Sequence, residues 1–244
     1  GTKYQVYVYP VYKRTGTYKR GEIYTGSTSA YGDIRTTPGV VTGVNQTRWY
    51  RWAKTCHVAW DDQTGVDGYE VTFSKHDGSV IERKTVDYNS YSHSIQNTII
   101  YKVSVRAYSN INGRVYYSPS GSPDCFCMVQ PSVKEDKAEV GIKWNGNRMK
   151  ISWKKLNGAT GYNVYMSTSK DSGYKKVKSV NKSKSSVTIS KLGKKKLSKG
   201  KKYYIYVEAY KKVNGNTFTT GRNYITTVKG KKVSFEYASG YSER

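Results

Sequence analysis

The chain has few cysteines and no long apolar stretch. Its 244 residues include three cysteines and five prolines. No run of about 18 apolar residues occurs, so we expect no membrane insertion. No segment keeps a 3.6-residue apolar period, which argues against helix. The sequence also lacks a nucleophile motif, a glycine-rich phosphate loop and the ligand spacing of a calcium or zinc site. We therefore expect a non-enzymatic protein without cofactor or metal.

The three cysteines, Cys56, Cys125 and Cys127, are too few for a disulfide scaffold. Cys125 and Cys127 are too close in sequence to bond easily to each other. Cys56 could pair with either Cys125 or Cys127, and one free thiol would then remain.

Tyrosines and short apolar runs are abundant. The chain has 25 tyrosines, and aromatic residues make up 14% of it. Alternating apolar runs bounded by Gly, Asn, Ser and Thr recur about every ten residues, which predicts antiparallel strands. Asn145-Gly146 lies between two such runs and predicts a hairpin. In the first half of the chain, the first strand is predicted at residues 40–44.

One pattern occurs twice: a tryptophan, a tyrosine nine residues later, and then a tyrosine-led strand six residues after an aliphatic residue. Its members are Trp60, Tyr69 and Tyr101 in the first copy, and Trp153, Tyr162 and Tyr203 in the second. A repeat of this length predicts tandem domains. Seven short strands per copy, with an inward tryptophan on the second, predict all-β sandwiches. The last tyrosine should bond backbone upstream as a tyrosine corner.

This pattern resembles the fibronectin type III family, over residues 37–131 and 132–230. Segments 152–177 and 200–218 are particularly similar to the lysine- and tyrosine-rich variety found in secreted and surface proteins of Gram-positive, Clostridia-like bacteria. The resemblance implies tandem seven-stranded, immunoglobulin-like β-sandwiches in an extracellular protein, secreted or at the bacterial cell surface. It implies no particular ligand, because this fold carries unrelated functions.

The two ends of the chain lie outside the full copies. Residues 4–12 repeat the sixth-strand motif, with Pro10 where the full copies have alanine. We interpret residues 1–36 as a β-hairpin, the last two strands of a partial copy. A lone hairpin is marginal in water, so it should dock on the first full domain or be completed by other strands. The tail, residues 231–244, contains a candidate extra strand at 233–237 that could complete it.

The net charge of +25 is concentrated in the second copy. Residues 132–230 carry 24 basic and 5 acidic side chains, against 9 and 8 in residues 37–131. A lysine run before the sixth strand could attract polyanions such as wall teichoic acid or a sulfated glycan; a solvated loop is the alternative. No nucleic-acid fold signature accompanies it, so no specific nucleic acid is expected. The candidate residues are Lys194, Lys195, Lys196, Lys199, Lys201 and Lys202.

A second candidate site is the cluster Trp49, Tyr50, Arg51 and Trp52. These aromatic rings cannot all face one small core, because alternation along a strand exposes about half of them. Exposed Trp, Tyr and Arg are enriched at binding hot spots. The alternative is that the cluster packs against the N-terminal hairpin.

Together these observations favour a monomeric, non-catalytic binding or adhesion fragment of a bacterial cell-surface or secreted protein. The expected partner is a host protein, such as an immunoglobulin or an extracellular matrix protein, or a glycan, bound through exposed aromatic residues. Two alternatives stay open: a passive spacer between other domains, and polyanion attachment through the basic second copy.

Overall fold

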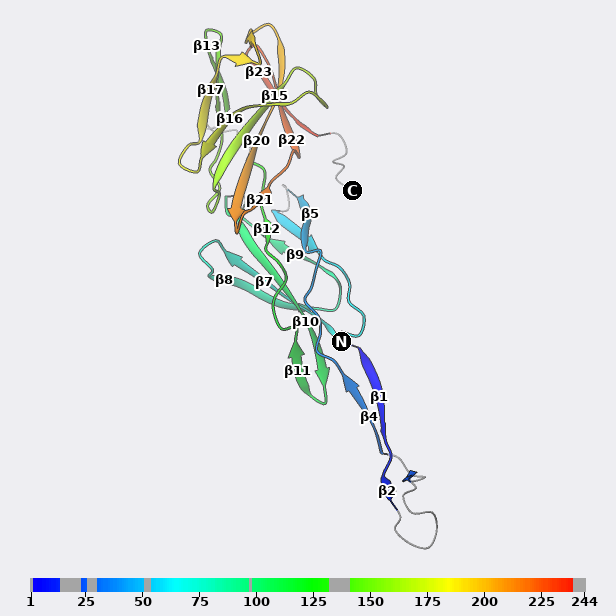
Figure 1. The fold of residues 1–244 in the computed structure, drawn as a ribbon. Helices are drawn as coiled ribbons and strands as arrows, with labels where there is room; N and C mark the ends of the chain where they lie inside the picture. The colour runs from blue at the N-terminus through cyan, green and yellow to red at the C-terminus, as the bar shows by residue number, and fades with distance from the viewer. Residues whose placement is uncertain are drawn as a thin grey trace.

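The protein consists of two β-sandwiches in line, with a thin ribbon that extends beyond the first (Figure 1). The computed structural model describes residues 2–13, 23–25, 30–50, 54–96, 98–131 and 141–238. All regular elements in this part are β-strands, and none of it forms a helix that could span a membrane. The prediction of an all-β fold with tandem sandwiches is confirmed.

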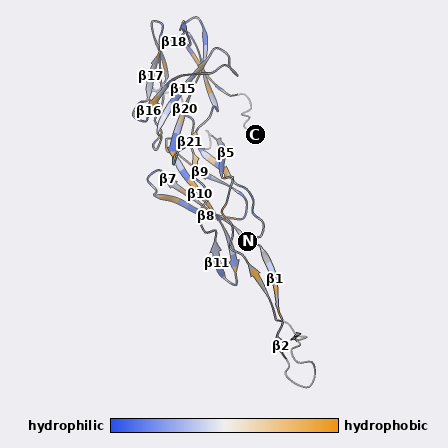
Figure 2. Ribbon diagram, in the orientation of Figure 1, coloured by the Kyte–Doolittle hydropathy of each residue, from blue (hydrophilic) through white to orange (hydrophobic). Residues whose placement is uncertain are grey.

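The first sandwich has seven strands, the last of them in two pieces. Its strands are β5 (Asn45–Tyr50), β6 (Thr55–Ala59), β7 (Gly68–Lys75), β8 (Val80–Val86), β9 (Ser90–Ser94), β10 (Tyr101–Ile111), β11 (Arg114–Tyr117) and β12 (Cys125–Cys127). One sheet has the order β5-β6-β9 and the other β11-β10-β7-β8, with β12 also paired to β10. Apolar and polar residues alternate along the strands (Figure 2), which places the core between the two sheets.

The second sandwich repeats this plan and adds one strand. Its strands are β13 (Gly141–Asn145), β14 (Arg148–Ser152), β15 (Gly161–Ser167), β16 (Lys175–Asn181), β17 (Ser186–Ile189), β20 (Lys202–Val213), β21 (Asn216–Thr219), β22 (Tyr224–Lys229) and β23 (Lys232–Tyr237). The sheets have the orders β13-β14-β17 and β16-β15-β20-β22-β23, with β21 on β20. The candidate tail strand therefore exists, but it pairs with β22 and does not complete the N-terminal hairpin.

The repeated tryptophan and tyrosine pack together in each core. The ring centroids are 5.3 Å apart for Trp60 and Tyr69, and 5.4 Å apart for Trp153 and Tyr162. Each of these tyrosine hydroxyls also accepts a hydrogen bond, 2.7 Å long, from the backbone N–H six residues before it. The pattern thus fastens the loop between the second and third strands to the core.

The tyrosines that lead the sixth strands form the predicted corners. The Tyr101 hydroxyl accepts a hydrogen bond from the backbone N–H of Gln96 at 3.1 Å. The Tyr203 hydroxyl accepts one from the backbone N–H of Ser198 at 2.9 Å. In each sandwich this contact holds the connection that crosses from one sheet to the other.

The two sandwiches share a packed joint. Ile100, Phe126 and Met128 of the first sandwich are buried in the core of the second. In the opposite direction, Tyr224 is buried in the core of the first. The Phe126 ring packs edge-on against Phe218, with centroids 4.9 Å apart. Because each core receives side chains from the other, the joint is an apolar interface and more than a linker.

Gln130 adds polar bonds to this joint. Its side chain is almost fully buried. The amide nitrogen donates to the Tyr224 carbonyl at 2.9 Å, and the amide oxygen accepts from the N–H groups of Asn223 and Tyr224 at 2.6 and 2.8 Å. Buried hydrogen bonds of this kind fix geometry, because breaking them would leave desolvated polar groups.

The prediction of a first strand at residues 40–44 is wrong; that strand is β5. The backbone turns at Gly43, which has a φ of +66°, and the Thr42 carbonyl accepts from the N–H of Asp61. Val41 is fully buried without belonging to a strand. Of the three valines in this run, only Val41 is buried, and the turn at Gly43 prevents an extended strand.

The N-terminal ribbon has four strands: β1 (Lys3–Val8), β2 (Val11–Lys13), β3 (Ile23–Thr25) and β4 (Ala30–Arg35). β1 pairs with β4, and β2 pairs with β3. The long strand β10 of the first sandwich has the same order of pairing: its first residues pair with the distant β12, and its last residues pair with β11, which follows it directly. The interpretation of residues 1–36 as a partial copy stays a prediction. The ribbon extends away from the first sandwich in Figure 1, with Tyr4 and Tyr9 about half exposed.

Candidate functional site

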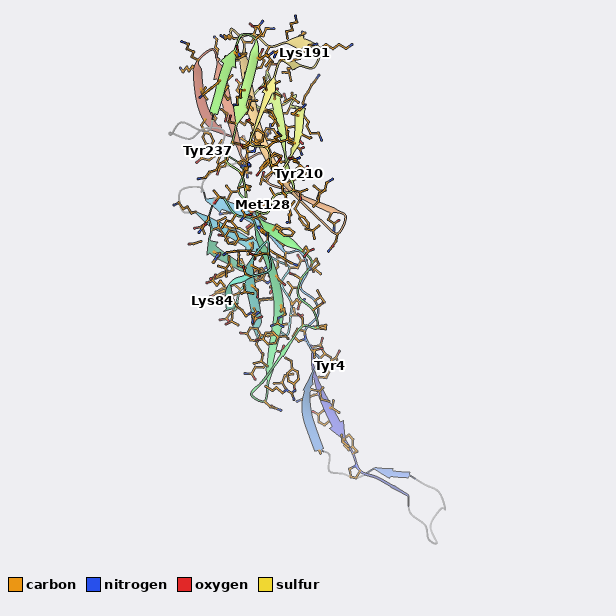
Figure 3. All side chains as sticks on the ribbon, turned by 90° about the vertical axis from the view of Figure 1, so that its left-hand side faces the viewer. Tyr4, Lys84, Met128, Lys191, Tyr210 and Tyr237 are labelled. Atoms are coloured by element: carbon orange, nitrogen blue, oxygen red, sulfur yellow. A yellow bond between two sulfur atoms is a disulfide. The ribbon has the colours of Figure 1, made fainter. Side chains whose placement is uncertain are left out.

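The predicted lysine run forms a short hairpin at the end of the second sandwich that lies away from the joint. Figure 3 shows Lys191 at this end and Met128 at the other. Strands β18 (Lys191–Leu192) and β19 (Lys195–Lys196) turn at Gly193, where φ is +60°. The hairpin is held by the Leu197 N–H, which donates to the Ser190 carbonyl at 3.0 Å. The lysines are therefore placed by backbone hydrogen bonds.

These lysines surround a hollow of about 590 Å³, which we call the distal hollow. Its charged lining residues are Lys175, Lys194, Lys195, Lys196 and Lys201. Thr168, Leu192 and Tyr203 contribute the neutral part of the lining. The lining contains no acidic side chain, so the hollow is suited to an anion.

The structure brings together four of the six predicted lysines. Lys199 and Lys202 do not line the hollow. The Lys199 carbonyl accepts a hydrogen bond from the N–H of Gly230, and the Lys202 ammonium lies 5.1 Å from the Tyr204 ring centroid. Sequence reasoning missed Lys175. Its Nζ atom lies beside Gly193, 3.5 Å from the position that a Cβ atom would take on that glycine. Strand β16 brings Lys175 to the site from outside the run.

The lysines of the distal hollow have no carboxylate partners among the described residues. The ion pairs of the described second sandwich and tail include only Lys170 with Glu236, at 2.9 Å. Unit charges 4 Å apart interact by about 1 kcal/mol in water and more near a protein surface. Five unneutralised ammonium groups therefore repel one another, and an anion in the hollow would relieve that repulsion.

Tyrosines cover the outer face of the larger sheet in the second sandwich, which sequence reasoning did not single out. The rings of Tyr165 and Tyr206 stack in parallel with centroids 4.6 Å apart, and Tyr174 packs edge-on against Tyr206. The Arg222 guanidinium lies 4.9 Å from the Tyr174 ring centroid. Burial raises the pKa of Tyr174 to about 12, although Arg222 acts in the opposite direction. The ring faces are therefore already in contact with one another and with Arg222. They stabilise the sheet and leave little free ring surface for a ligand.

The aromatic cluster at 49–52 falls largely outside the described residues. The backbone of Trp49 and Tyr50 forms the end of β5, opposite Cys56 and Thr55. Their side chains, and the whole of Arg51 and Trp52, lie outside the described part. Ligand binding through this cluster stays a prediction.

A disulfide joins Cys56 to Cys127 across the first sandwich. It links β6 of one sheet to β12 of the other, and it settles which of the two cysteines bonds Cys56 in this structure. Cys125 is free and buried, and burial raises the pKa of its thiol to about 11. A structural disulfide is typical of extracellular proteins in general.

The three histidines of the chain each contact a polar side chain. Within the described part of the chain, no three His, Cys, Asp or Glu side chains come together as a metal site. Burial, followed by the charge of Arg48, lowers the pKa of His57, and the Nδ1 atom of its ring lies 2.7 Å from the Thr47 hydroxyl. His76 contacts Asn157, and His93 contacts Glu82.

Comparisons with known proteins found similar chains among solved structures. No family model matches the chain, and no curated protein does either. Among solved structures, the chicken CNTN1 FN1–FN3 domains are 18% identical, with 97% of this chain and 75% of that chain covered and a TM-score of 0.33. A two-domain fibronectin type III segment from chicken tenascin is 15% identical, with 73% and 96% covered and a TM-score of 0.31. The central fibronectin-III array of RIM-binding protein is 14% identical, with 77% and 70% covered and a TM-score of 0.28. The chain is thus similar to fibronectin type III arrays, and its own strand order carries the assignment of tandem sandwiches.

Proposed function

We propose that the chain is a non-catalytic binding module whose second sandwich attaches to an anionic polymer through the distal hollow. One observation carries the proposal: Lys175, Lys194, Lys195, Lys196 and Lys201 line a single hollow that contains no acidic side chain. Positive potential focused in a concave site raises the local concentration of anions.

The finer setting belongs to the same proposal. The resemblance to lysine-rich fibronectin type III repeats supports a secreted or surface protein of Gram-positive bacteria, and the disulfide supports an oxidising compartment. Wall teichoic acid and sulfated glycans fit the hollow, since both carry repeated anionic esters. Recognition of a host immunoglobulin or matrix protein through residues 49–52 has no described side chain to support it.

Retention on immobilised heparin and on immobilised polyphosphate tests the proposal. The chain should be retained at low salt and released at moderate salt, because contacts between exposed charges are screened. The triple variant Lys194→Gln, Lys195→Gln, Lys196→Gln should elute at clearly lower salt than the unmodified chain.

A matched control separates a site from overall charge. Lys143, Arg148 and Lys150 are exposed on the other sheet of the same sandwich and line neither the distal hollow nor the joint. Their triple change to Gln removes the same charge. Equal loss of retention in both triple variants would show that net charge alone binds. Absence of retention in the unmodified chain would favour a passive spacer.

A further inference from the structure

A second basic hollow, of about 1190 Å³, lies at the joint between the sandwiches, and we call it the joint hollow. Four lysines of the second sandwich line it: Lys154, Lys155, Lys182 and Lys211. His76, Thr98 and Ile99 of the first sandwich also contribute to the lining. The site is therefore complete only when both sandwiches are in place.

Hydrogen bonds around Asn157 fix the wall that the first sandwich contributes. The Asn157 N–H donates to the Thr98 carbonyl at 2.6 Å, and the Ile100 N–H donates to the Asn157 carbonyl at 2.9 Å. The side-chain oxygen of Asn157 contacts the His76 ring at 2.7 Å. Two backbone hydrogen bonds therefore join the two sandwiches at this wall of the joint hollow.

The joint hollow also lacks acidic side chains. Its four lysines form no ion pair with any carboxylate of the described residues. Two carboxylates of the described second sandwich and tail are engaged elsewhere: Glu208 accepts from Asn163 and Tyr165, and Glu236 binds Lys170 and Thr227. The charged side chains that line the two hollows are therefore lysines, without an acidic neighbour in either lining.

Strand β16 connects the two hollows. It begins at Lys175, which lines the distal hollow, and it ends at Asn181, which lines the joint hollow together with Lys182. Lys176 and Lys178 are exposed between them. At about 3.3 Å per residue, the strand covers about 20 Å. β16 is also the edge strand of its sheet, so no further strand of the described chain covers it.

We propose that the distal hollow, strand β16 and the joint hollow form one continuous track for an extended linear anionic polymer. This inference rests on the proposed function and adds the shape of the ligand: a flexible chain of phosphate or sulfate esters longer than about 20 Å. A short anion fills one hollow only. A long chain occupies both, and the second contact becomes intramolecular, which raises the affinity without any new kind of bond.

The first sandwich has a defined part in this arrangement. It is close to neutral in charge, so it adds little attraction of its own. It closes the joint hollow with His76, Thr98 and Ile99, and the packed joint keeps that wall in place. It is therefore a positioning element for the end of the track.

The experiment measures affinity against ligand length in the full chain. Linear polyphosphates of defined length, some shorter and some longer than the track, are titrated by calorimetry at fixed salt. Chains long enough to reach both hollows should bind about tenfold or more tighter than chains that fill one. Their affinity should also fall more steeply with salt, because more contacts displace counterions. Heparin oligosaccharides of matched length separate sulfate from phosphate chains.

Three variants locate the effect. Lys154→Gln, Lys155→Gln, Lys182→Gln should abolish the gain with length and leave the binding of short chains at the distal hollow unchanged. Lys194→Gln, Lys195→Gln, Lys196→Gln should weaken short and long chains alike. Lys143→Gln, Arg148→Gln, Lys150→Gln should leave the affinities for short and for long chains almost unchanged. Only the small long-range effect of the lost charge should remain. All nine positions are exposed, so the fold should persist.

Two results would overturn the track and leave the proposed function standing. One is equal affinity for short and long chains in the unmodified protein. The other is a gain with length that survives the three changes at the joint hollow. If the changes at the distal hollow leave short-chain binding intact, the proposed function itself is wrong.

Discussion

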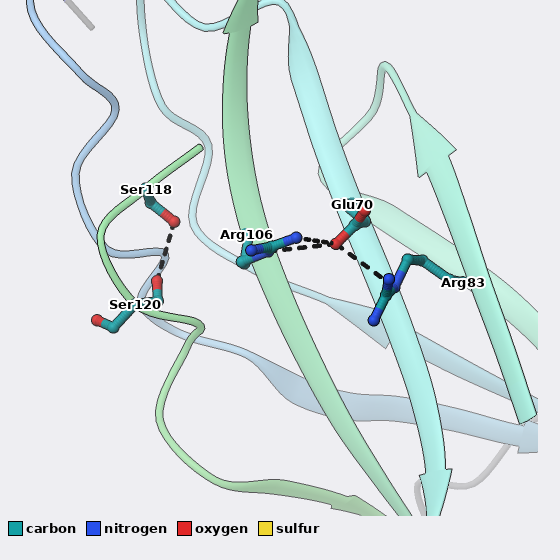
Figure 4. A network of polar contacts seen from close by, with 5 residues as sticks. All are labelled: Glu70, Arg83, Arg106, Ser118 and Ser120. Carbon is teal, nitrogen blue, oxygen red and sulfur yellow. Dashed lines mark hydrogen bonds and ion pairs between the residues drawn. The ribbon is translucent and has the colours of Figure 1, made fainter. Parts of the chain in front are cut away.

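The two sandwiches agree where side chains point inward and differ where they point outward. In both, a tryptophan packs on a tyrosine at nearly the same distance, and a second tyrosine anchors the crossover between sheets. On the outer face of the first, Glu70 accepts hydrogen bonds from Arg106 at 2.6 and 3.2 Å, and Arg83 lies 3.7 Å away (Figure 4).

The equivalent outward positions of the second sandwich carry different chemistry. Asn163 occupies the position of Glu70, and Glu208 occupies that of Arg106. The ion pair is replaced by hydrogen bonds of Glu208 with Asn163 and Tyr165, beside the stacked tyrosines. The framework therefore needs the inward residues, while the outward ones are free to serve binding or local stability.

The largest expected effect tests the shared framework. Trp60→Ala and Trp153→Ala each remove a side chain that is 3% or 2% exposed. Each should lower the free energy of unfolding of its own sandwich by about 3–5 kcal/mol, because burial is lost and a cavity is left. Urea unfolding, with hydrogen exchange to identify the sandwich, measures both. If one substitution lowers the free energy of unfolding several times more than the other, the two tryptophans do not have equivalent roles.

The disulfide should distinguish the two sandwiches. Changing Cys56 and Cys127 together to Ala should destabilise the first sandwich by about 2–5 kcal/mol, because the unfolded chain loses its constraint. The second sandwich should change little. Urea unfolding with and without reductant is the measurement, and Cys125→Ala is the control. If reductant shifts neither transition, the bond does not contribute to stability.

A smaller effect should separate the outer faces. Glu70→Gln keeps the shape but removes the charge that binds Arg106. We expect a loss of about 1 kcal/mol, since Arg106 and Arg83 are partly exposed and screened. Glu208→Gln in the second sandwich has neutral partners and should change stability less. High salt should reduce the difference between the stability losses of the two variants. A difference that does not depend on salt would contradict an electrostatic cause.

The sequence predicted the repeated core well. Tryptophan, tyrosine and the alternating strands are inward features whose spacing follows from the pleat. Residues 186–189 and 114–117 are strands as expected. The strand at 40–44 was wrong because a positive φ at Gly43 cannot be read from an apolar run.

The candidate site was predicted only in part, for a physical reason. Lysines within one run are visible in the sequence, but Lys175 comes from strand β16 and meets them only in the folded sheet. The joint hollow is lined by loops of both sandwiches, so no short sequence motif predicts it. The shared burial of Phe126 and Tyr224 was equally invisible, since each looks like a residue of its own domain.

The position of the Cys56–Cys127 bond has a mechanical consequence. Tension applied along the chain would pass from Cys56 directly to Cys127 and bypass the polypeptide between these two cysteines, which are separated by 71 positions in the sequence. At about 3.4 Å per residue, roughly 240 Å of polypeptide is withheld from stretching. The second sandwich has no such bond among its described residues. Under load, the first sandwich would yield only a short length, and the second would extend as a long, compliant tether.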